Sequence, residues 1–344
     1  MTQLVAGYPC DREMAVKYAP EYQSALIQQT LLLPGGGCAY YRAQKGDACT
    51  FCAFPGFIRS VIKGEGFEHD FSSWKLPSEI YHTMLETLTA NNHGVERLAI
   101  FNGGSFFPNS ELPGDFQRSV YQYAATHPTI KQLFVEGYPN FISKAKLVEA
   151  KSLLGDKDLL VGVGFESAND TVRNTMLKKG IDKRVFEQKV ALMHELGVQV
   201  SVYVFLKAPQ LTEYQAYQDV VATLRYLHDL GVAHMALSCA FVPENTPLAT
   251  LYHSGGFRPP WLWTITEIKK LADKEGWPLT IGGFDDTPPP VAGPSNCAKC
   301  NGSVLGAIER SRREGYLDVT AIPTCECQQQ WQPLFQREQE QVIV

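Results

Sequence analysis

The sequence of 344 residues has no long hydrophobic run. Its apolar stretches, such as LAIF and VYVFL, fall far short of the ~20 residues that a helix needs to cross a bilayer. The opening MTQLVAGYPCDRE has neither a basic start nor an apolar centre, so a signal peptide is not expected. These absences predict a cytoplasmic protein that is not embedded in a membrane.

Several catalytic motifs and an excess of basic charge are also missing. No Gly-x-Gly-x-x-Gly follows the first expected strand, which disfavours a dinucleotide-binding fold. The sequence has no Walker loop, no Gly-x-Ser-x-Gly, and no HxH or HExxH, so histidine-based metallohydrolase chemistry is unsupported. A net charge of −5, from 31 basic and 36 acidic residues, gives no overall basic footprint for nucleic acid, although a local patch stays open.

What the sequence does contain is a regular alternation of apolar strands and amphipathic helices. With 44% hydrophobic and 19% charged residues, it can bury a sizeable core. Strict alternation predicts a parallel sheet with right-handed crossovers. We favour a partial (β/α)6 barrel with its site at the carboxyl ends of the strands over an open doubly wound sheet. The six expected strands span residues 26–33, 97–101, 132–136, 159–165, 199–206 and 234–242.

Capping patterns mark where the helices should begin and end. Thr212 with Gln215, and Thr264 with Glu267, each have the spacing of a capping box, which predicts a helix start at both threonines. Two further helices are expected to follow Ser143 and Asp182. Glycines mark the expected helix ends at positions 155, 197, 231 and 276.

The composition changes after Phe284, where DDTPPPVAGP predicts a stiff loop and a boundary. We therefore expect three parts. Residues 1–30 form an N-terminal extension, residues 31–284 form the barrel, and residues 285–344 form a small cysteine-rich extension. The Gln-rich tail from Gln336 is expected to fray.

Three cysteines lie in one glycine-bearing loop, PGGGCAYYRAQKGDACTFCAF, directly after the first expected strand. Ten residues separate Cys38 from Cys49, and two separate Cys49 from Cys52. Three thiolates cannot close a tetrahedral zinc site alone, whereas on a cubane iron–sulfur cluster they leave one iron open to substrate or cofactor. A loop of free thiols, or a zinc site completed by His69 or His82, remains the alternative.

This loop, placed on the first strand of an expected parallel barrel, resembles the signature of the radical S-adenosylmethionine (SAM) superfamily. The resemblance implies a 4Fe–4S cluster held by Cys38, Cys49 and Cys52, whose fourth iron chelates SAM. It also implies reductive cleavage of SAM to a 5′-deoxyadenosyl radical that abstracts a hydrogen from the substrate. An electron donor of flavodoxin or ferredoxin type is the expected partner.

The closer resemblance is to one branch, the archaeosine-forming radical SAM enzymes. It rests on FNGGSFF, VEGYPNFIS, VGFESANDTVRNTMLKKG, VYVFLKAPQLTE, GPSNCAKCNG and CECQQQW, in that order between residues 31 and 331. Those enzymes act on tRNA that carries a lysine-substituted 7-deazaguanine and cleave a carbon–nitrogen bond in the adduct. The acidic charge and the lack of an appended RNA-binding module imply that tRNA would be reached only through a partner protein. A small-molecule metabolite is the alternative substrate.

The resemblance also assigns SAM-binding residues. Gly103, Gly104 and Ser105 fill the position of the superfamily's Gly-Gly motif, whose backbone receives the amino group of SAM. Phe51 would sit beside the adenine. The alternatives are an ordinary glycine turn and a core phenylalanine.

Charged residues end three of the expected strands. Glu136 and Glu166 each follow an apolar run, where a charge is costly unless it has a partner. The resemblance implies hydrogen bonds to the methionyl or ribose groups of SAM, and a structural salt bridge is the alternative. Lys207 is expected either to bind a substrate anion or to pair with Glu136 or Glu166.

Four further cysteines form a second cluster near the carboxyl terminus. Cys297 and Cys300 make a CxxC, and Cys325 and Cys327 make a CxC. Four thiolates close a coordination shell, so a structural zinc ion is favoured, with a second 4Fe–4S cluster as the competing metal centre. The two isolated cysteines, Cys10 and Cys239, are expected not to bind metal.

Overall fold

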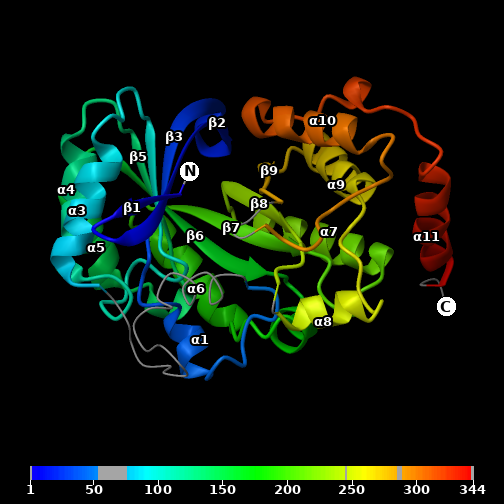
Figure 1. Ribbon diagram of the computed structural model, residues 1–344, viewed down its shortest axis with the longest axis horizontal. Coiled ribbons are helices and arrows are strands. Elements are labelled where there is room, and N and C mark those ends of the chain that lie inside the picture. The colour runs from blue at the N-terminus through cyan, green and yellow to red at the C-terminus, as the bar shows by residue number, and fades with distance from the viewer. Residues whose placement is uncertain (1, 53–75, 245, 285–288, 342–344) are drawn as a thin grey trace.

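The computed structural model describes residues 2–52, 76–244, 246–284 and 289–341 (Figure 1). A single sheet of nine strands runs in the order β1 to β9. No helix in these ranges is long and apolar enough to span a bilayer. The strands are β1 (Thr2–Val5), β2 (Tyr8–Ala19), β3 (Ser24–Leu32), β4 (Arg97–Phe101), β5 (Gln132–Glu136), β6 (Asp158–Glu166), β7 (Gln199–Leu206), β8 (His234–Cys239) and β9 (Leu279–Ile281).

The parallel part of the sheet confirms the expected α/β partial barrel. All six expected strands are present as β3 to β8, and each is hydrogen-bonded in parallel to the next. The three-residue strand β9 extends this array, and β1 and β2 add an antiparallel hairpin at the other edge. The sequence analysis missed β9 because it is too short to show a pattern. The strand order stays linear, so the barrel is open between β3 and β9 in the described chain.

The helices connect the strands and cover the outer face of the sheet. Figure 1 shows α3, α4 and α5 at one side of the molecule and α9, α10 and α11 at the other, with α1 and α8 at the lower edge of the view. Their bounds are α1 (Ala39–Ala43), α3 (Ser78–Thr89), α4 (Gly114–Thr126), α5 (Lys144–Leu154), α6 (Lys183–Glu195), α7 (Glu213–Asp229), α8 (Pro247–His253), α9 (Leu262–Glu275), α10 (Asn301–Glu314) and α11 (Gln328–Gln341).

Three of the four expected helix starts are confirmed. Ser143, Asp182 and Thr212 accept hydrogen bonds from backbone N–H groups in the first turns of α5, α6 and α7, and Thr212 forms the full capping box with Gln215. The start expected at Thr264 is wrong, because α9 already begins at Leu262. The Thr264 side chain makes tertiary hydrogen bonds instead of capping the helix.

The inner face of the sheet changes character along the strands. At the amino ends it is polar: Arg97 is 2% exposed, forms an ion pair with Glu21, and donates to Gln132 and Gln28. In the middle it is apolar, with Ala99, Phe134 and Leu160 packed together. A buried polar layer therefore lies at the amino ends of the strands in the described barrel.

The carboxyl-terminal extension packs onto the barrel. Cys300, Val304 and Trp331 are buried in the same hydrophobic core as the strands. The tail expected to fray from Gln336 belongs to α11, which continues to Gln341. Residues 285–288 of the expected boundary loop lie outside the described residues.

Candidate active site

Strained backbone gathers at the carboxyl end of the barrel. Non-glycine residues rarely adopt a positive φ, and such strain is concentrated at functional sites. Eight described non-glycine residues have a positive φ, and six of them lie in the cysteine loop or at and after the ends of β6 and β7. These six are Lys45, Cys49, Glu166, Lys178, Lys207 and Gln210.

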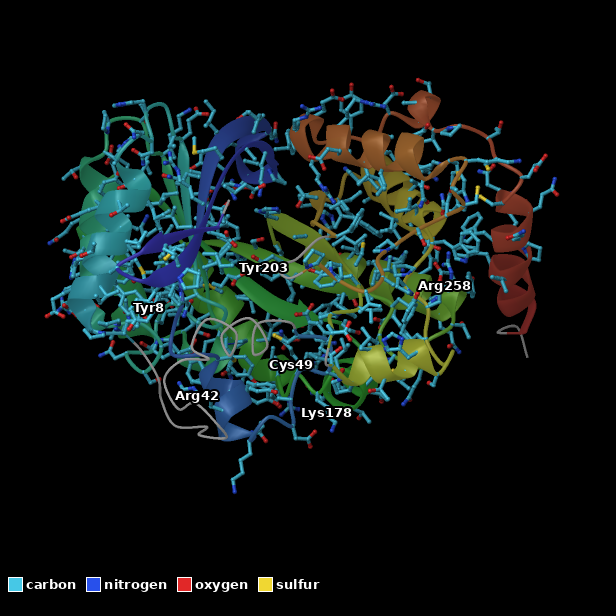
Figure 2. The ribbon with its side chains drawn as sticks, in the orientation of Figure 1. Tyr8, Arg42, Cys49, Lys178, Tyr203 and Arg258 are labelled. Carbon is cyan, nitrogen blue, oxygen red and sulfur yellow. The ribbon has the colours of Figure 1, made fainter. Side chains whose placement is uncertain are left out.

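The cysteine loop rests on the segment that follows the π-helix Thr171–Met176. The backbone N–H of Cys49 donates to the carbonyl of Lys178 at 3.1 Å, and the N–H of Thr50 donates to that of Leu177 at 3.3 Å. The Cys52 N–H donates back to the Cys49 carbonyl at 2.9 Å. Figure 2 shows Cys49 and Lys178 close together at this edge. Backbone hydrogen bonds therefore help to hold the loop in place.

The ammonium group of Lys179 brings the three cysteines into one electrostatic environment. Burial raises the pKa of the Cys38 and Cys49 thiols, and the nearby charge of Lys179 opposes this rise. Against the lowering effect of burial, the pKa of Lys179 is raised by Glu166 and by the charges of Cys49 and Cys52. Cys38 and Cys49 also interact with each other. All three cysteines thus lie near the same ammonium group.

The donor set fits a cationic metal centre. Burial is the largest effect on both thiols; it raises the pKa of Cys38 to about 11 and also raises that of Cys49. Burial therefore favours the neutral thiols, and coordination of a metal cation is what would stabilise thiolates at this place. None of the nine cysteines forms a disulfide. Of the alternative zinc ligands, His82 lies on α3 with its Nε2 atom 3.6 Å from an Asp115 oxygen, and His69 lies outside the described residues.

Behind the cysteines, the turn after β4 approaches the loop closely. A Cβ atom added at Gly104 would lie 3.0 Å from the Cα of Cys38 and 2.0 Å from a carboxylate oxygen of Glu111, so only glycine fits. Gly103 has a φ of 67°. The expected Gly-Gly turn thus lies against the start of the cysteine loop.

Glu111 joins these two segments, and sequence reasoning missed it. Its side chain is fully buried and accepts one hydrogen bond from the Ala39 N–H at 2.9 Å and another from the Ser105 N–H at 2.5 Å. Burial raises the pKa of Glu111 to about 7, while the two backbone bonds oppose this shift. Nothing in the string PNSELPG signals this role, because the Ala39 donor lies 72 positions away in the sequence.

The two expected acidic residues lie on the inner side of the barrel mouth. Glu166 is buried and accepts from Lys179 Nζ at 2.8 Å, while its second oxygen, Oε2, has no hydrogen-bond partner. Glu136 accepts a hydrogen bond from Tyr203, and burial raises the pKa of this carboxyl to about 7. Figure 2 shows Tyr203 in the middle of the sheet. A buried carboxylate oxygen without a partner fits a ligand that carries hydroxyl or amino groups.

Phe51 lies at the same mouth. Its ring packs against Phe205 with a centroid separation of 4.4 Å, and Lys179 Nζ lies 5.4 Å from its centroid. Phe51 thus connects the cysteine loop to the end of β7.

One of the two expectations for Lys207, an ion pair with Glu136 or Glu166, is wrong. Lys207 forms an ion pair with Glu213, six residues later at the start of α7. The turn after β7 brings the two residues together, so the lysine finds its counter-ion locally rather than on a neighbouring strand.

The four carboxyl-terminal cysteines converge on one point. Their sulfur atoms all lie within 4.8 Å of one another. The Sγ–Sγ distances are 3.7 Å between Cys297 and Cys300, 3.5 Å between Cys297 and Cys325, and 3.5 Å between Cys300 and Cys327. The indole N–H of Trp263 donates to Cys327 Sγ at 3.3 Å. This cluster can hold a metal ion.

Comparison with known proteins was made by sequence and by structure. No family model matches the chain. It is 25% identical over 314 residues to archaeosine synthase subunit beta of Methanosarcina acetivorans, covering 90% of this chain and 85% of that protein. It is 23% identical over 310 residues to archaeosine synthase subunit beta of Thermococcus kodakarensis, covering 88% and 90%. The Elp3 structure from Methanocaldococcus infernus aligns with a TM-score of 0.49 at 15% identity, covering 70% of this chain and 59% of that one.

The parallel barrel and the cysteine loop at its mouth match the arrangement expected for an enzyme of the radical SAM type. Within that type, the chain resembles archaeosine synthase subunit beta. The resemblance predicted from the sequence is therefore confirmed.

Proposed function

We propose that this enzyme cleaves a carbon–nitrogen bond in a lysine-type adduct of a tRNA 7-deazaguanine. Support comes from two relatives named archaeosine synthase subunit beta, each aligned over most of both chains. The single observation that carries the radical chemistry is a loop with three cysteines, none in a disulfide, whose first cysteine lies against the glycine turn at the carboxyl end of the barrel. The word subunit in the relatives' names supports a partner chain through which tRNA is reached.

Cys38, Cys49 and Cys52 would hold a 4Fe–4S cluster. When bound, the cluster and SAM supply a carbon-centred radical that removes a hydrogen atom from the substrate. The residues of this chain hold and orient these groups. An electron donor of flavodoxin or ferredoxin type would reduce the cluster.

Residues around the mouth would hold SAM. The backbone of Gly103, Gly104 and Ser105 would receive its amino group, and the free Oε2 atom of Glu166 would accept a hydrogen bond from its hydroxyl or amino groups. Phe51 would offer an aromatic face to the adenine. Glu136, with its neutral form favoured by burial, would complete the polar lining together with Tyr203.

A small-molecule substrate is the second candidate, and the charge of the chain favours it. Binding to tRNA depends on neutralising phosphates, whereas this chain carries a net charge of −5. The two candidates share the radical chemistry and differ in the substrate on which it acts.

We further propose that the carboxyl-terminal cysteines hold one zinc ion rather than a second cluster. A zinc–sulfur bond of about 2.3 Å places tetrahedral ligands about 3.8 Å apart. Three of the sulfur separations, 3.5 to 3.7 Å, lie close to that value, and all four sulfurs lie within 4.8 Å of one another. In a 4Fe–4S cluster each thiolate binds a different iron, which holds the sulfurs farther apart. An indole N–H directed at Cys327 is the kind of surrounding contact that orients a metal-bound thiolate.

The proposed function is tested by anaerobic turnover. The reduced, reconstituted enzyme is given SAM together with either tRNA that carries the lysine adduct and the partner subunit, or the free adduct base. We expect 5′-deoxyadenosine to form in step with cleaved adduct on tRNA, and neither product with a Cys49→Ala variant. Turnover of the free base alone would move the assignment to the small-molecule substrate. A fully loaded enzyme that forms no 5′-deoxyadenosine with any of these would overturn the proposal.

A further inference from the structure

A pocket outside the cysteine loop opens beside the end of β7. It has a volume of about 260 Å³ and lies between the turn after β7 and the segment that joins α8 to α9. Lys207, Gln210, Gly256 and Arg258 are among its lining residues. Arg258 is labelled in Figure 2 on the side of the molecule nearer to α8 and α9. The pocket is large enough for a carboxylate or phosphate group with several attached atoms.

Two cationic side chains line this pocket, and one carboxylate lies next to it. Glu213 uses Oε2 for its ion pair with Lys207. Its Oε1 atom accepts from the Trp261 N–H at 2.8 Å and from the Thr264 hydroxyl at 2.6 Å. Glu213 is therefore fixed on one side of Lys207. An ammonium group has three N–H donors, and Glu213 is the single acceptor that the described residues give to Lys207.

Arg258 has no carboxylate partner within ion-pair distance in the described chain. Its guanidinium lies 3.9 Å above the ring of Trp261 and donates to the carbonyls of Pro259 and Ser295 at 3.0 and 2.9 Å. These contacts use two of the five N–H donors of arginine. Burial lowers the pKa of Arg258, with nearby Glu213 acting in the opposite direction. The two cations and one anion leave a net positive charge at the pocket.

The backbone around the pocket is strained. Lys207 and Gln210 both have a φ of 75°. Strain of this kind persists where the surrounding structure holds it in place, and it clusters at ligand-binding sites.

We propose that this pocket binds an oxyanion of the substrate, held by the fork of Arg258 and by Lys207. The inference rests on the proposed function for its choice of ligand, since a lysine-type adduct carries an α-carboxylate at the end remote from the base. A phosphate of the nucleic acid would satisfy the same donors. Glu213 is a positioning residue that keeps the Lys207 ammonium at the pocket wall.

The test measures anion binding to the loaded full-length enzyme by calorimetry. The probes are L-lysine, its carboxamide, which lacks the carboxylate, and inorganic phosphate. We expect L-lysine to bind and the carboxamide not to bind. Because charge-assisted bidentate bonds are strong, Arg258→Gln should weaken L-lysine binding ~10- to 100-fold, and Arg258→Lys should restore part of the affinity. Saturable binding of phosphate without L-lysine binding, with the same Arg258 dependence, would support the site and assign its anion to a phosphate.

Two further variants guard against a mere loss of folding. Gly256→Asp places a carboxylate in the pocket wall where the added Cβ meets ordinary contacts of 3.5 Å or more, so it should fold and repel the anion. Arg225→Gln is the matched control, because Arg225 also lies over a tryptophan ring, at 6.0 Å, but on α7 outside the pocket. Equal binding of either anion to wild type, Arg258→Gln and Gly256→Asp, or binding of neither anion to wild type, would overturn the inference. Anion binding that depends on Arg258 in an enzyme that does not cleave SAM would instead count against the proposed function alone.

Discussion

Gly180 offers a direct test of how the cysteine loop is held. It has a φ of 62°, and a Cβ atom placed there would lie 2.0 Å from the hydroxyl oxygen of Tyr40. Contacts below 3.0 Å do not occur for real Cβ atoms, so Tyr40 would have to move by at least 1.0 Å (3.0 − 2.0). Tyr40 stacks on Tyr138 at 4.8 Å and lies two residues after Cys38. Gly180→Ala should therefore displace the first cysteine of the proposed cluster.

The matched control is Gly197→Ala. Gly197 has a φ of 64° and nothing within 4 Å of an added Cβ, so it carries the backbone strain without the clash. Both variants should lose ~1 kcal/mol of stability from the left-handed backbone. Only Gly180→Ala should lose iron after anaerobic reconstitution, by at least half, with a weaker charge-transfer absorbance. Equal iron content in the two variants would refute the idea that this contact positions the loop.

Three other predictions concern buried ionisable groups. Glu21→Gln breaks the buried ion pair with Arg97 and should lower the free energy of unfolding in urea by ~3–5 kcal/mol. The control Glu13→Gln removes an exposed ion pair and should lower it by under ~1 kcal/mol. Similar losses in the two variants would contradict a stabilising role for the buried polar layer. Burial lowers the pKa of His234 to about 4, with Glu21 raising it and Arg97 lowering it. The neutral form is favoured on folding, so stability should fall between about pH 6.5 and 4 by up to ~1.4 kcal/mol per unit; a His234→Asn variant with the same slope would exclude this source. Glu111→Ala should slow SAM cleavage at least ~10-fold, because it removes the two hydrogen bonds that Glu111 accepts from the Ala39 and Ser105 N–H groups. Glu111→Gln should slow it less. An unchanged rate in Glu111→Ala would show that these two bonds are not needed.

Local signals made much of the fold predictable. The caps at Ser143, Asp182 and Thr212 and the six apolar strands depend on residues close together in the sequence, and the structure contains all of them. Thr264 has the same local pattern as Thr212, but its hydroxyl bonds to Glu213, which no local pattern shows.

The site was predictable only where one loop carries its chemistry. The spacing of Cys38, Cys49 and Cys52 lies within a single segment, so it could be read directly. Glu111 and Lys179 lie in segments that follow other strands, β4 and β6. No local pattern in the sequence shows that Glu111 accepts a hydrogen bond from the loop backbone or that Lys179 lies near the loop thiols. The ion pair of Lys207 with Glu213 depends on a tight turn whose strained backbone contains no glycine to announce it.

The most direct test of the central claim is a count of iron, sulfide and zinc per chain after anaerobic purification. The wild type is compared with a Cys38/Cys49/Cys52→Ala variant and with a Cys297/Cys300→Ala variant. We predict that the first variant loses about four irons and keeps about one zinc, and that the second loses zinc while keeping an iron centre. Iron that remains bound when Cys38, Cys49 and Cys52 are all absent would contradict the account.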